Sequence, residues 1–300
     1  MMKKTKTTKS WNSDRTFNLI LTILVLLWLV IVLYPLIYVV SSSFSSGTAV
    51  MSGQVILWPV DPSVNGYIAV FSHKAVWKGY LNTILYTVFG SIISLVVTLL
   101  MAYPLSRKSF TGRRVIMTLV LITMFFSGGL IPTYILVSSL GLVNTRAIIL
   151  ILGALSTGNM IVMRTYFQTS IPEDLLEAGK LDGISDVGYL LKIVLPLSKP
   201  VISVILLYCV VAHWNAYFTP LIYLRDRELY PLQLVLREIL AATRIDASQF
   251  ADAEAAAMAA GQADTMKFAL VVVATVPMLI LYPFVQKFFE KGVMIGSLKG

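Results

Sequence analysis

Long apolar runs separated by short charged segments dominate the pattern along this chain. A helix of about 20 residues crosses the hydrocarbon of a bilayer, so an uncharged run of about 18 or more predicts a spanning helix. Five runs meet this criterion, and a slightly shorter sixth ends at Arg164, whose long side chain can reach the interface. The predicted spans are Phe17–Val40, Leu81–Ser106, Val115–Thr145, Ala147–Met163, Pro200–Leu224 and Phe268–Gln286.

Two runs have features beyond their length. Val115–Thr145 is longer than one span needs, and Gly128, Gly129 and Pro132 near its middle predict a kink or break there. No small-residue cleavage site follows the N-terminal run at once, which favours an anchor over a cleaved signal peptide. The sequence therefore predicts an all-α integral membrane protein with six transmembrane helices.

Composition and charge support a membrane protein. The chain is 57% hydrophobic and 13% charged, whereas a soluble domain carries roughly 25% charged residues. The net charge is +9, and 16 of the 24 lysines and arginines lie in the two terminal segments and in alternate loops, including Ser106–Arg114 and Arg164–Pro200. The positive-inside rule then places both termini in the cytoplasm, and the basic charge implies no nucleic-acid partner. We expect a basic cytoplasmic tail (1–16), a six-span domain (17–291) and a cytoplasmic C-terminal tail (292–300) in the plasma membrane.

The chain has few of the residue types and none of the motifs that these kinds of catalysis need. Cys209 is the single cysteine, and His73 and His213 are the two histidines, so a disulfide, a cysteine-based metal site and an H-E-x-x-H motif are excluded. The sequence has no G-x-x-x-x-G-K-[ST] motif for binding ATP phosphates. We expect no catalytic residue, cofactor or metal in this chain, and any ATP hydrolysis must come from a partner.

The segment Ser170–Pro200 is polar and charged, although it lies between two apolar runs. Ser170 and Glu173 have the spacing of a capping box, with Pro172 in the first turn. This pattern predicts a short helix over about Ile171–Asp182.

A second short helix is predicted after the first. Gly183 can adopt the positive φ that stops the first helix, and Ser185 offers an N-cap for the next. The second helix can run to about Val194, until Pro196 ends it. The expected result is a helix–glycine–helix unit along the inner membrane face.

The spacing E-A-[AG]-x(3)-G-x(9)-I-x-L-P within this segment resembles the cytoplasmic EAA loop of membrane subunits of ATP-driven (ABC) importers. The resemblance implies a coupling helix that docks into an ATPase subunit. Ala178 and Gly179 would let another backbone approach closely, and Glu177 would supply a charge suited to arginine. Gly179 departs from the family, which usually has alanine there. The implied coupling residues are Glu177, Ala178, Gly179, Asp182, Gly183, Ile193, Leu195 and Pro196.

Further motifs resemble the maltose-type, carbohydrate-uptake branch of this family, and two of them resemble Gram-positive oligosaccharide permeases. The resemblance implies a type I ABC importer permease fold, membrane lipid around it, a second homologous permease, an ATPase dimer that uses ATP, and an extracellular sugar-binding protein. The motifs are Leu81–Thr83, Gly128–Thr133 and Gly292–Gly300 for the branch, and His213–Asn215 and Tyr230–Gln233 for the subgroup.

Candidate sugar-facing residues cluster in the fifth predicted span: His213, Trp214, Asn215, Tyr217 and Phe218. On one helix, Trp214, Tyr217 and Phe218 would share a face through i, i+3 and i+4 spacing. Sugars need apolar stacking surfaces and hydrogen-bonding groups, and this cluster offers both. The alternative is a set of interfacial aromatics with satisfied polar neighbours.

Asn159 in the fourth predicted span is a further candidate for the sugar path, because polar groups within spans more often serve a pore or helix packing than face lipid. The leading interpretation is the permease subunit of a binding-protein-dependent oligosaccharide importer, forming half of the pore. A permease for another solute class of the same family is the alternative. An ion-coupled secondary transporter fits poorly, because the six predicted spans contain no Asp or Glu and no repeat is visible.

Overall fold

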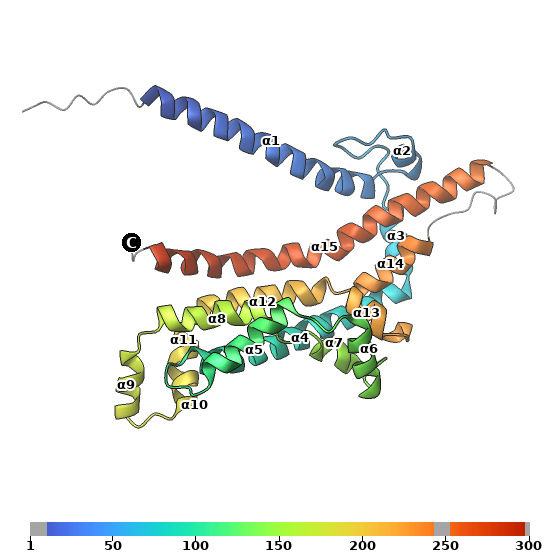
Figure 1. The fold of residues 1–300 in the computed structure, drawn as a ribbon. Coiled ribbons are helices and arrows are strands. Elements are labelled where there is room, and N and C mark those ends of the chain that lie inside the picture. Colours follow the sequence, from blue (N-terminus) through green and yellow to red (C-terminus); the bar gives the residue numbers. More distant parts are fainter. Residues whose placement is uncertain (1–10, 243–252, 298–300) are drawn as a thin grey trace, which may run out of the picture. The chain divides into compact units, whose positions relative to one another are not determined.

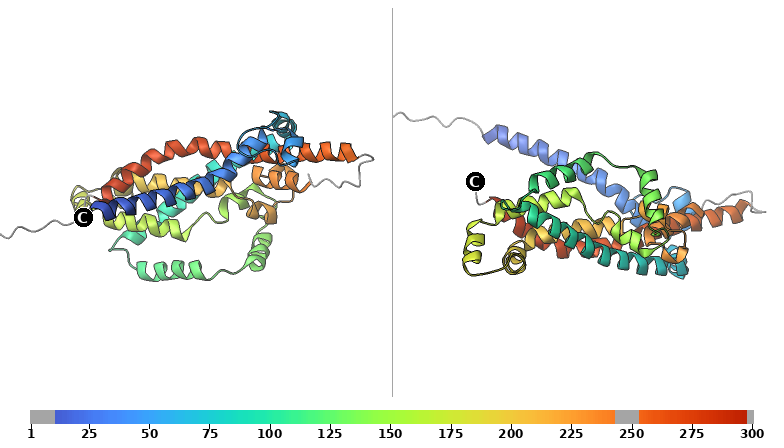
Figure 2. Two further views of the ribbon diagram at one scale, coloured as in Figure 1. Left: turned by 90° about the horizontal axis from the view of Figure 1, so that it is seen from above. Right: turned by 60° about the horizontal axis from the view of Figure 1, so that its bottom comes forward.

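The computed structural model describes residues 11–242 and 253–297, and every regular element in these ranges is a helix. The chain divides into two compact units, which we describe separately. The first unit consists of Met1–Ser72 and Ala242–Val273, and the second consists of His73–Ala241 and Ala274–Gly300. Figures 1 and 2 show the ribbon from three directions.

The first unit contains α1 (Trp11–Ser43), α2 (Gly47–Met51), α3 (Asn65–Ser72) and the first part of α15 (Ala253–Ser297). The serines that end α1 fix the loop that follows it. The Ser41 hydroxyl donates to the Leu57 carbonyl at 2.6 Å, and the Val60 amide donates to the Ser45 hydroxyl at 3.1 Å. Helices α2 and α15 approach closely, because a Cβ atom on Gly47 would lie 2.5 Å from the Gly261 carbonyl carbon.

The second unit is organised around α4 (Lys74–Ser106), which packs against α8 (Thr157–Ser170) and α12 (Lys199–Trp214). These three helices run side by side in Figures 1 and 2. The remaining elements are α5 (Arg113–Phe125), α6 (Leu130–Ser139), α7 (Arg146–Ile151), α9 (Asp174–Leu181), α10 (Asp186–Tyr189), the π-helical turn η1 (Leu190–Val194), α11 (Leu195–Leu197), α13 (Phe218–Tyr223), the 3-10 turn η2 (Arg227–Leu229), α14 (Leu232–Ala242) and the end of α15.

The pattern of α4 is the opposite of that of an amphipathic helix in a soluble protein. Its buried face is small or hydroxylated, and its exposed face is apolar. The buried set includes Gly79, Thr83, Thr87, Gly90, Ser91, Ser94, Thr98 and Ala102. The exposed set includes Leu81, Ile84, Val88, Ile92, Val96 and Leu100. Small inward residues let helix backbones approach in a bilayer, where the apolar face meets lipid.

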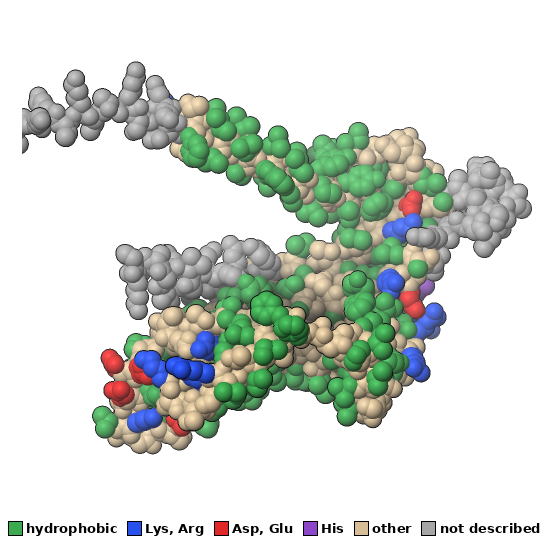
Figure 3. Space-filling model, in the orientation of Figure 1, with side chains coloured by type: hydrophobic (Ala, Val, Ile, Leu, Met, Phe, Trp, Pro, Cys, Tyr) green, Lys and Arg blue, Asp and Glu red, His purple; other side chains and the backbone are tan. Residues whose placement is uncertain are grey.

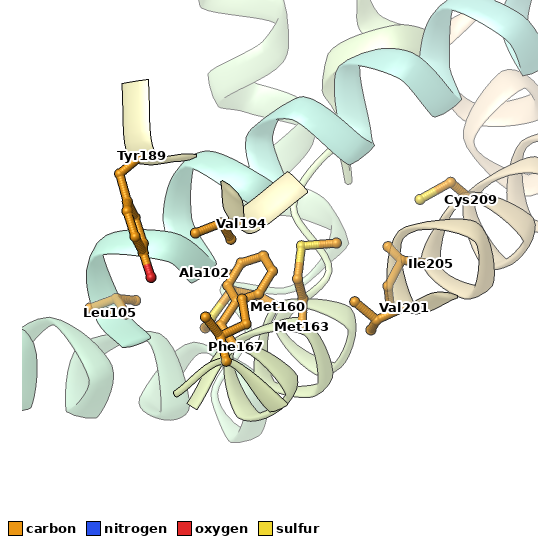
Figure 4. Packing of buried hydrophobic residues seen from close by; sticks show 11 residues of the cluster. Ala102, Leu105, Met160, Met163, Phe167, Tyr189, Val194, Val201, Ile205 and Cys209 are labelled. Atoms are coloured by element: carbon orange, nitrogen blue, oxygen red, sulfur yellow. The ribbon is translucent and has the colours of Figure 1, made fainter. Parts of the chain in front are cut away.

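The main apolar cluster joins four parts of the second unit at one end of α4 (Figure 4). It takes residues from α4, α8 and α12 and from the loop between the last two. The buried members are Ala102, Leu105, Met160, Met163, Phe167, Ile171, Tyr189, Val194, Val201, Ile205 and Cys209. This cluster anchors the loop that carries α9 and α10 to the three packed helices.

Three helical segments in the described part of the chain are long and apolar enough to cross a membrane, or up to five if each of two bent pairs is one span. The three are Arg15–Ser43, Lys74–Ser106 and Ala260–Leu281. The pair α5 and α6 is bent by 115°, which confirms the break predicted at Gly128 and Gly129. The second pair, Asp186–Leu197 and Lys199–Trp214, is bent by 83°.

Two predicted spans are divided in the structure. The run Ala147–Met163 is interrupted between α7 and α8, where Gly153 has φ of 81°, and α8 continues past Arg164 to Ser170. Arg164 therefore lies within a helix and donates from Nε to the Leu105 carbonyl at 2.9 Å. The run Pro200–Leu224 is divided between α12 and α13. Uncharged composition does not report a left-handed glycine or a loop inside such a run, so these two runs stay predictions as single spans.

Several boundaries also differ from the prediction. Helix α4 begins at Lys74, before Leu81, and α15 encloses the predicted sixth span within 45 residues. The apolar residues of Leu232–Leu240 have helical spacing and lie in α14, and α15 opens at Ala253 with a stretch rich in alanine. Most of the predicted basic tail and the last three residues lie outside the described residues, and α15 extends through Ser297.

The close contact between α4 and α12 gives a prediction. A Cβ atom on Gly90 would lie 2.6 Å from His213 Cε1, so Gly90→Ala should lower the free energy of unfolding by about 1–3 kcal/mol through overpacking. Gly158→Ala is the control, since its added Cβ would meet no atom closer than 4.0 Å. The thermal midpoint of the purified protein measures both changes. Equal midpoints for the two variants would contradict the close packing.

Candidate functional site: a helical loop and a polar cavity

The loop between α8 and α12 forms two short helical segments around a glycine. Helix α9 ends at Leu181, and Gly183 has φ of 72°, the left-handed conformation that glycine adopts without strain. Ser185 then caps α10, because its hydroxyl accepts a hydrogen bond from the Gly188 amide at 3.1 Å. The predicted helix–glycine–helix arrangement and its second N-cap are therefore confirmed.

Two details of that prediction are wrong. Ser170 is the last residue of α8 and does not cap α9, which begins at Asp174, after Pro172. The Glu173 carboxylate instead accepts a hydrogen bond from Lys108 Nζ at 2.5 Å. Pro196 does not end the second helix, because it lies in the first turn of α11, where its missing N–H is tolerated. The π-helical turn η1 precedes it.

The predicted coupling residues divide into exposed and packed groups. Glu177, Ala178, Asp182, Gly183 and Pro196 are exposed, and Ile193 and Leu195 are half-buried. Gly179 is buried, and a Cβ atom on it would lie 3.3 Å from Tyr189 Cδ2. Gly179 therefore packs within the chain, so the expectation that both small residues face a partner is wrong for Gly179. The most exposed apolar side chain of the loop is Leu181, at 90%.

A stack of three side chains connects this loop to α4. The Arg107 guanidinium carbon lies 4.7 Å from the centre of the Tyr103 ring and 4.9 Å from the centre of the Tyr189 ring. Tyr189 is 1% exposed, and its ring also packs against Gly179. Cation–π contacts of this kind stabilise a fixed geometry. In the sequence, Arg107 is one of the cations of Ser106–Arg114 and supports only the membrane orientation. The signal for part of the stack is Tyr103, one helical turn before Arg107.

A cavity of about 400 Å³ lies between α4, the α7–α8 connection and the α12–α13 region. Ser94 and Thr98 come from α4, one turn apart, and the Ser94 hydroxyl lies 3.2 Å from His213 Nε2. None of the lining residues is acidic or a Lys or Arg. The full lining is Ser94, Thr98, Ile149, Leu152, Gly153, Ala154, Ser156, Asn159, Tyr208, Cys209, Ala212, His213, Ala216 and Thr219.

Of the residues predicted to face a sugar, Asn159 and His213 line this cavity. The shared helical face predicted for Trp214, Tyr217 and Phe218 is wrong, because α12 ends at Trp214 and α13 begins at Phe218. The hydroxyl groups of the lining were not predicted, although Ser94 and Thr98 have i, i+4 spacing on α4, which was a readable signal.

The other members of that predicted group lie outside the cavity lining. Trp214 is 4% exposed, its Nε1 donates to the Ala274 carbonyl at 3.1 Å, and its ring meets Tyr80 edge-on at 6.2 Å. Tyr217 and Phe218 are exposed, with ring centres 6.4 Å apart. The Asn215 amide donates to the carbonyl of Val211 at 3.0 Å. Trp214 is thus held within helix packing.

Comparison with known proteins gives consistent matches over nearly the whole chain. The family model described as the binding-protein-dependent transport system inner membrane component matches residues 94–295. The polygalacturonan/rhamnogalacturonan transport system permease protein YtcP of Bacillus subtilis (strain 168) is 39% identical, over 96% of this chain and 99% of that protein. The arabinooligosaccharides transport system permease protein AraQ of Halalkalibacterium halodurans is 26% identical, over 100% of both chains.

The fold has a solved counterpart as well. A chain in the crystal structure of a bacterial ABC transporter involved in the import of the acidic polysaccharide alginate matches with a TM-score of 0.85 and 38% identity, covering 95% of this chain and 100% of that one.

Fold, loop and cavity together define a multi-pass, all-helical membrane permease. The chain belongs to the family of binding-protein-dependent transport system inner membrane components, the permeases of ABC importers. A permease of this family works with a partner permease, an ATPase and a binding protein, and ATP is hydrolysed by the separate ATPase subunits. The spacing of the loop motif resembled that of ABC importer permeases, and membership of this family is confirmed.

The placement of Trp214 gives a prediction. Trp214→Ala should lower the free energy of unfolding by about 3–5 kcal/mol, because it removes a buried ring and its hydrogen bond to the Ala274 carbonyl. Tyr217→Ala, at an exposed position, should change it by about 0.5 kcal/mol or less. Thermal midpoint and uptake per assembled copy measure the two effects. A stable Trp214→Ala protein with reduced uptake per copy would instead place Trp214 in the sugar path.

Proposed function

We propose that this permease forms half of the pore of an importer for oligosaccharides that carry uronic acids. The observation that carries the proposal is the cavity beside α4, which is lined by hydroxyl, amide and imidazole groups and by no acidic side chain. Such groups suit sugar hydroxyls, and the absence of Asp and Glu from the lining avoids repulsion of sugar carboxylates.

The relatives support the same substrate class. The relative at 39% identity is a polygalacturonan/rhamnogalacturonan transport protein, and the structure at 38% identity belongs to an importer of an acidic polysaccharide. A neutral oligosaccharide is the second candidate, because the AraQ relative is an arabinooligosaccharide permease. The family assignment removes the ion-coupled secondary transporter that the sequence left as a remote alternative.

The proposed topology has six spans with both termini in the cytoplasm. Helices α1, α4 and α15 would each cross once, α5 with α6 and α7 with α8 would form two broken spans, and α12 with α13 would form the remaining one. The cations of the α4–α5 turn and of the loop around α9 support this orientation, because positive charge gathers on the cytoplasmic side. In this scheme the chain itself binds no cofactor.

The sugar path is proposed to pass the cavity, with Asn159 and His213 as polar contacts. Asn215, Tyr217 and Phe218 remain candidates for a continuation of the path, because they follow His213 at the end of α12 and their side chains are exposed. The burial and hydrogen bond of Trp214 support a packing role for it.

Coupling to the ATPase is proposed to use the exposed side of α9. Glu177, Ala178 and Asp182 face outward there, and Gly183 ends the segment. On the inner side, Gly179 rests on Tyr189, which stacks on Arg107 at the end of α4. Ile193, Leu195 and Pro196 lie in the segment that leads from α10 to α12. Movement of α9 by the ATPase dimer would therefore be passed to α4, which contributes to the cavity.

Substitution of Gly183, which lies between α9 and α10, tests the coupling proposal. Gly183→Val should abolish uptake with insertion intact, because a β-branched residue is strained at φ of 72°. Gly183→Asn is the control, since asparagine tolerates this conformation far better, and it should keep most of the uptake. Uptake and ATPase activity of the reconstituted transporter measure the difference. Full uptake in Gly183→Val would contradict the proposal that this loop couples ATP hydrolysis to transport.

A charge introduced at Asn159, in the lining of the cavity, tests whether the substrate is negatively charged. Asn159→Asp keeps the shape and adds a negative charge, whereas Asn159→Ser removes the amide without adding charge. Two like charges about 8 Å apart repel by about 2 kcal/mol at an effective dielectric constant near 20. Uptake of a galacturonate oligomer by the complete transporter with its binding protein should therefore fall tenfold or more in Asn159→Asp and much less in Asn159→Ser. Equal uptake by the two variants, or uptake restricted to neutral oligomers, would contradict a uronate substrate.

A further inference from the structure

A second cavity, of about 490 Å³, lies at the end of α4 that carries Arg107. Three of its lining side chains are cations, and three others offer hydroxyl or amide groups. The lining consists of Ser106, Arg107, Lys108, Arg113, Phe167, Gln168, Thr169, Ile171, Pro172 and Glu173. Figure 3 shows Lys and Arg side chains gathered at this end of the second unit. None of these residues lines the first cavity.

Positive charge in this cavity exceeds negative charge. Glu173 is the one carboxylate of the lining, and it is bound to Lys108 at 2.5 Å. Within the described part of the chain, neither Arg107 nor Arg113 forms an ion pair with a carboxylate. Two unpaired guanidinium groups beside one cavity attract an anion, since a partly desolvated charge is stabilised by a counter-charge.

Arg107 also has unused hydrogen-bonding capacity. Its Nε and Nη2 atoms are buried and have no hydrogen-bond partner among the described residues. Its contacts are the ring faces of Tyr103 and Tyr189, and its carbonyl accepts a hydrogen bond from Arg113 Nη1 at 3.2 Å. That last bond holds the two arginines of the turn between α4 and α5 next to each other.

The exposed apolar face of α5 beside the cavity indicates that the anion is a lipid headgroup. Helix α5, which begins at Arg113, exposes Val115 at 63% and Leu119 at 57%, the pattern of a lipid-facing surface. Arginine forks match phosphate geometry, and basic pockets between transmembrane helices on the cytoplasmic side suit anionic lipid headgroups. A water occupies about 30 Å³ of liquid, so this cavity has room for a phosphate together with part of a glycerol ester.

We propose that this cavity binds the phosphate group of an anionic lipid of the inner leaflet, with Arg113 and Arg107 as its cationic partners. The inference rests on the cytoplasmic placement of the α4–α5 turn in the proposed topology. A bound headgroup would lie beside Arg107 of the aromatic stack and beside Glu173, just before α9. It would hold the turn and the start of the coupling loop at the membrane surface.

Arg113 and Arg114 provide a matched pair for the test. Both cations lie at the start of α5, but Arg113 lines the cavity and the exposed Arg114 does not. The complete transporter is placed in phosphatidylcholine nanodiscs containing a small fraction of spin-labelled phosphatidylglycerol, and the immobilised fraction is measured by electron paramagnetic resonance. Arg113→Gln should weaken the preference for phosphatidylglycerol about fivefold, the size expected for one juxtamembrane cation, and Arg114→Gln should not. Arg113→Lys, which retains the charge, should keep most of the preference.

Three outcomes would overturn the inference. Equal losses in Arg113→Gln and Arg114→Gln would indicate unspecific surface attraction. Displacement of the labelled lipid by an excess of inorganic phosphate, without preference for phosphatidylglycerol, would indicate a site for free phosphate. A preference that exists only in the permease stripped of its ATPase would indicate that an acidic group of the ATPase fills the cavity.

A topology measurement separates this inference from the proposed function. A cysteine at Ser109, in the α4–α5 turn, should react with a membrane-impermeant reagent in inside-out vesicles and not in right-side-out vesicles. Reaction from the outside would overturn the topology and the lipid site together. Reaction from the inside without a phosphatidylglycerol preference would overturn the lipid site alone.

Discussion

The close packing of α4 against α8 and α12 is the constraint on which the rest of this permease depends. In a bilayer the hydrophobic effect does not hold apolar helices together, so contact requires small residues and hydrogen-bonding groups. Helix α4 meets the first of these requirements with its buried glycines, serines and threonines, and the contact is close enough that a Cβ atom on Gly90 would lie 2.6 Å from His213 Cε1. The same hydroxyl-rich face, at Ser94 and Thr98, then supplies polar groups to the first cavity.

One helix thereby reaches three sites. At its start, Asn82 Nδ2 donates to the Glu228 carbonyl at 2.8 Å and Thr83 accepts from the Leu232 amide at 2.7 Å, which fixes the segment before α14. Its middle lines the cavity, and its end is followed by Arg107, which stacks on Tyr189 of the loop. In the proposed mechanism, a displacement of α9 moves a rigid helix that borders the substrate path, and no flexible element is needed between them.

The sequence predicted elements that depend on local chemistry and missed those that depend on packing. Gly183 and Ser185 were predictable, because a helix stop and an N-cap need particular residue types. The break at Gly153 was not predictable, because the run Ala147–Met163 is uncharged on both sides of this glycine. Trp214 was misplaced for a related reason: the helical spacing assumed that α12 continues, whereas it ends there. Tyr103 and Arg107 are four residues apart, but their stack with Tyr189 joins residues that are far apart in the chain, and no local pattern reveals that contact.

In the proposed coupling mechanism, the loop between α8 and α12 acts on α4 through the ring of Tyr189. The most direct test is the amount of sugar transported per ATP hydrolysed in reconstituted transporters carrying Tyr189→Leu or Tyr189→Phe. Phenylalanine keeps the ring over Arg107 and the contact with Gly179, whereas leucine removes the cation–π contact. Tyr189→Phe should couple normally, whereas Tyr189→Leu should hydrolyse ATP with several-fold less transport per ATP. Unchanged transport per ATP in an intact Tyr189→Leu complex would contradict this mechanism.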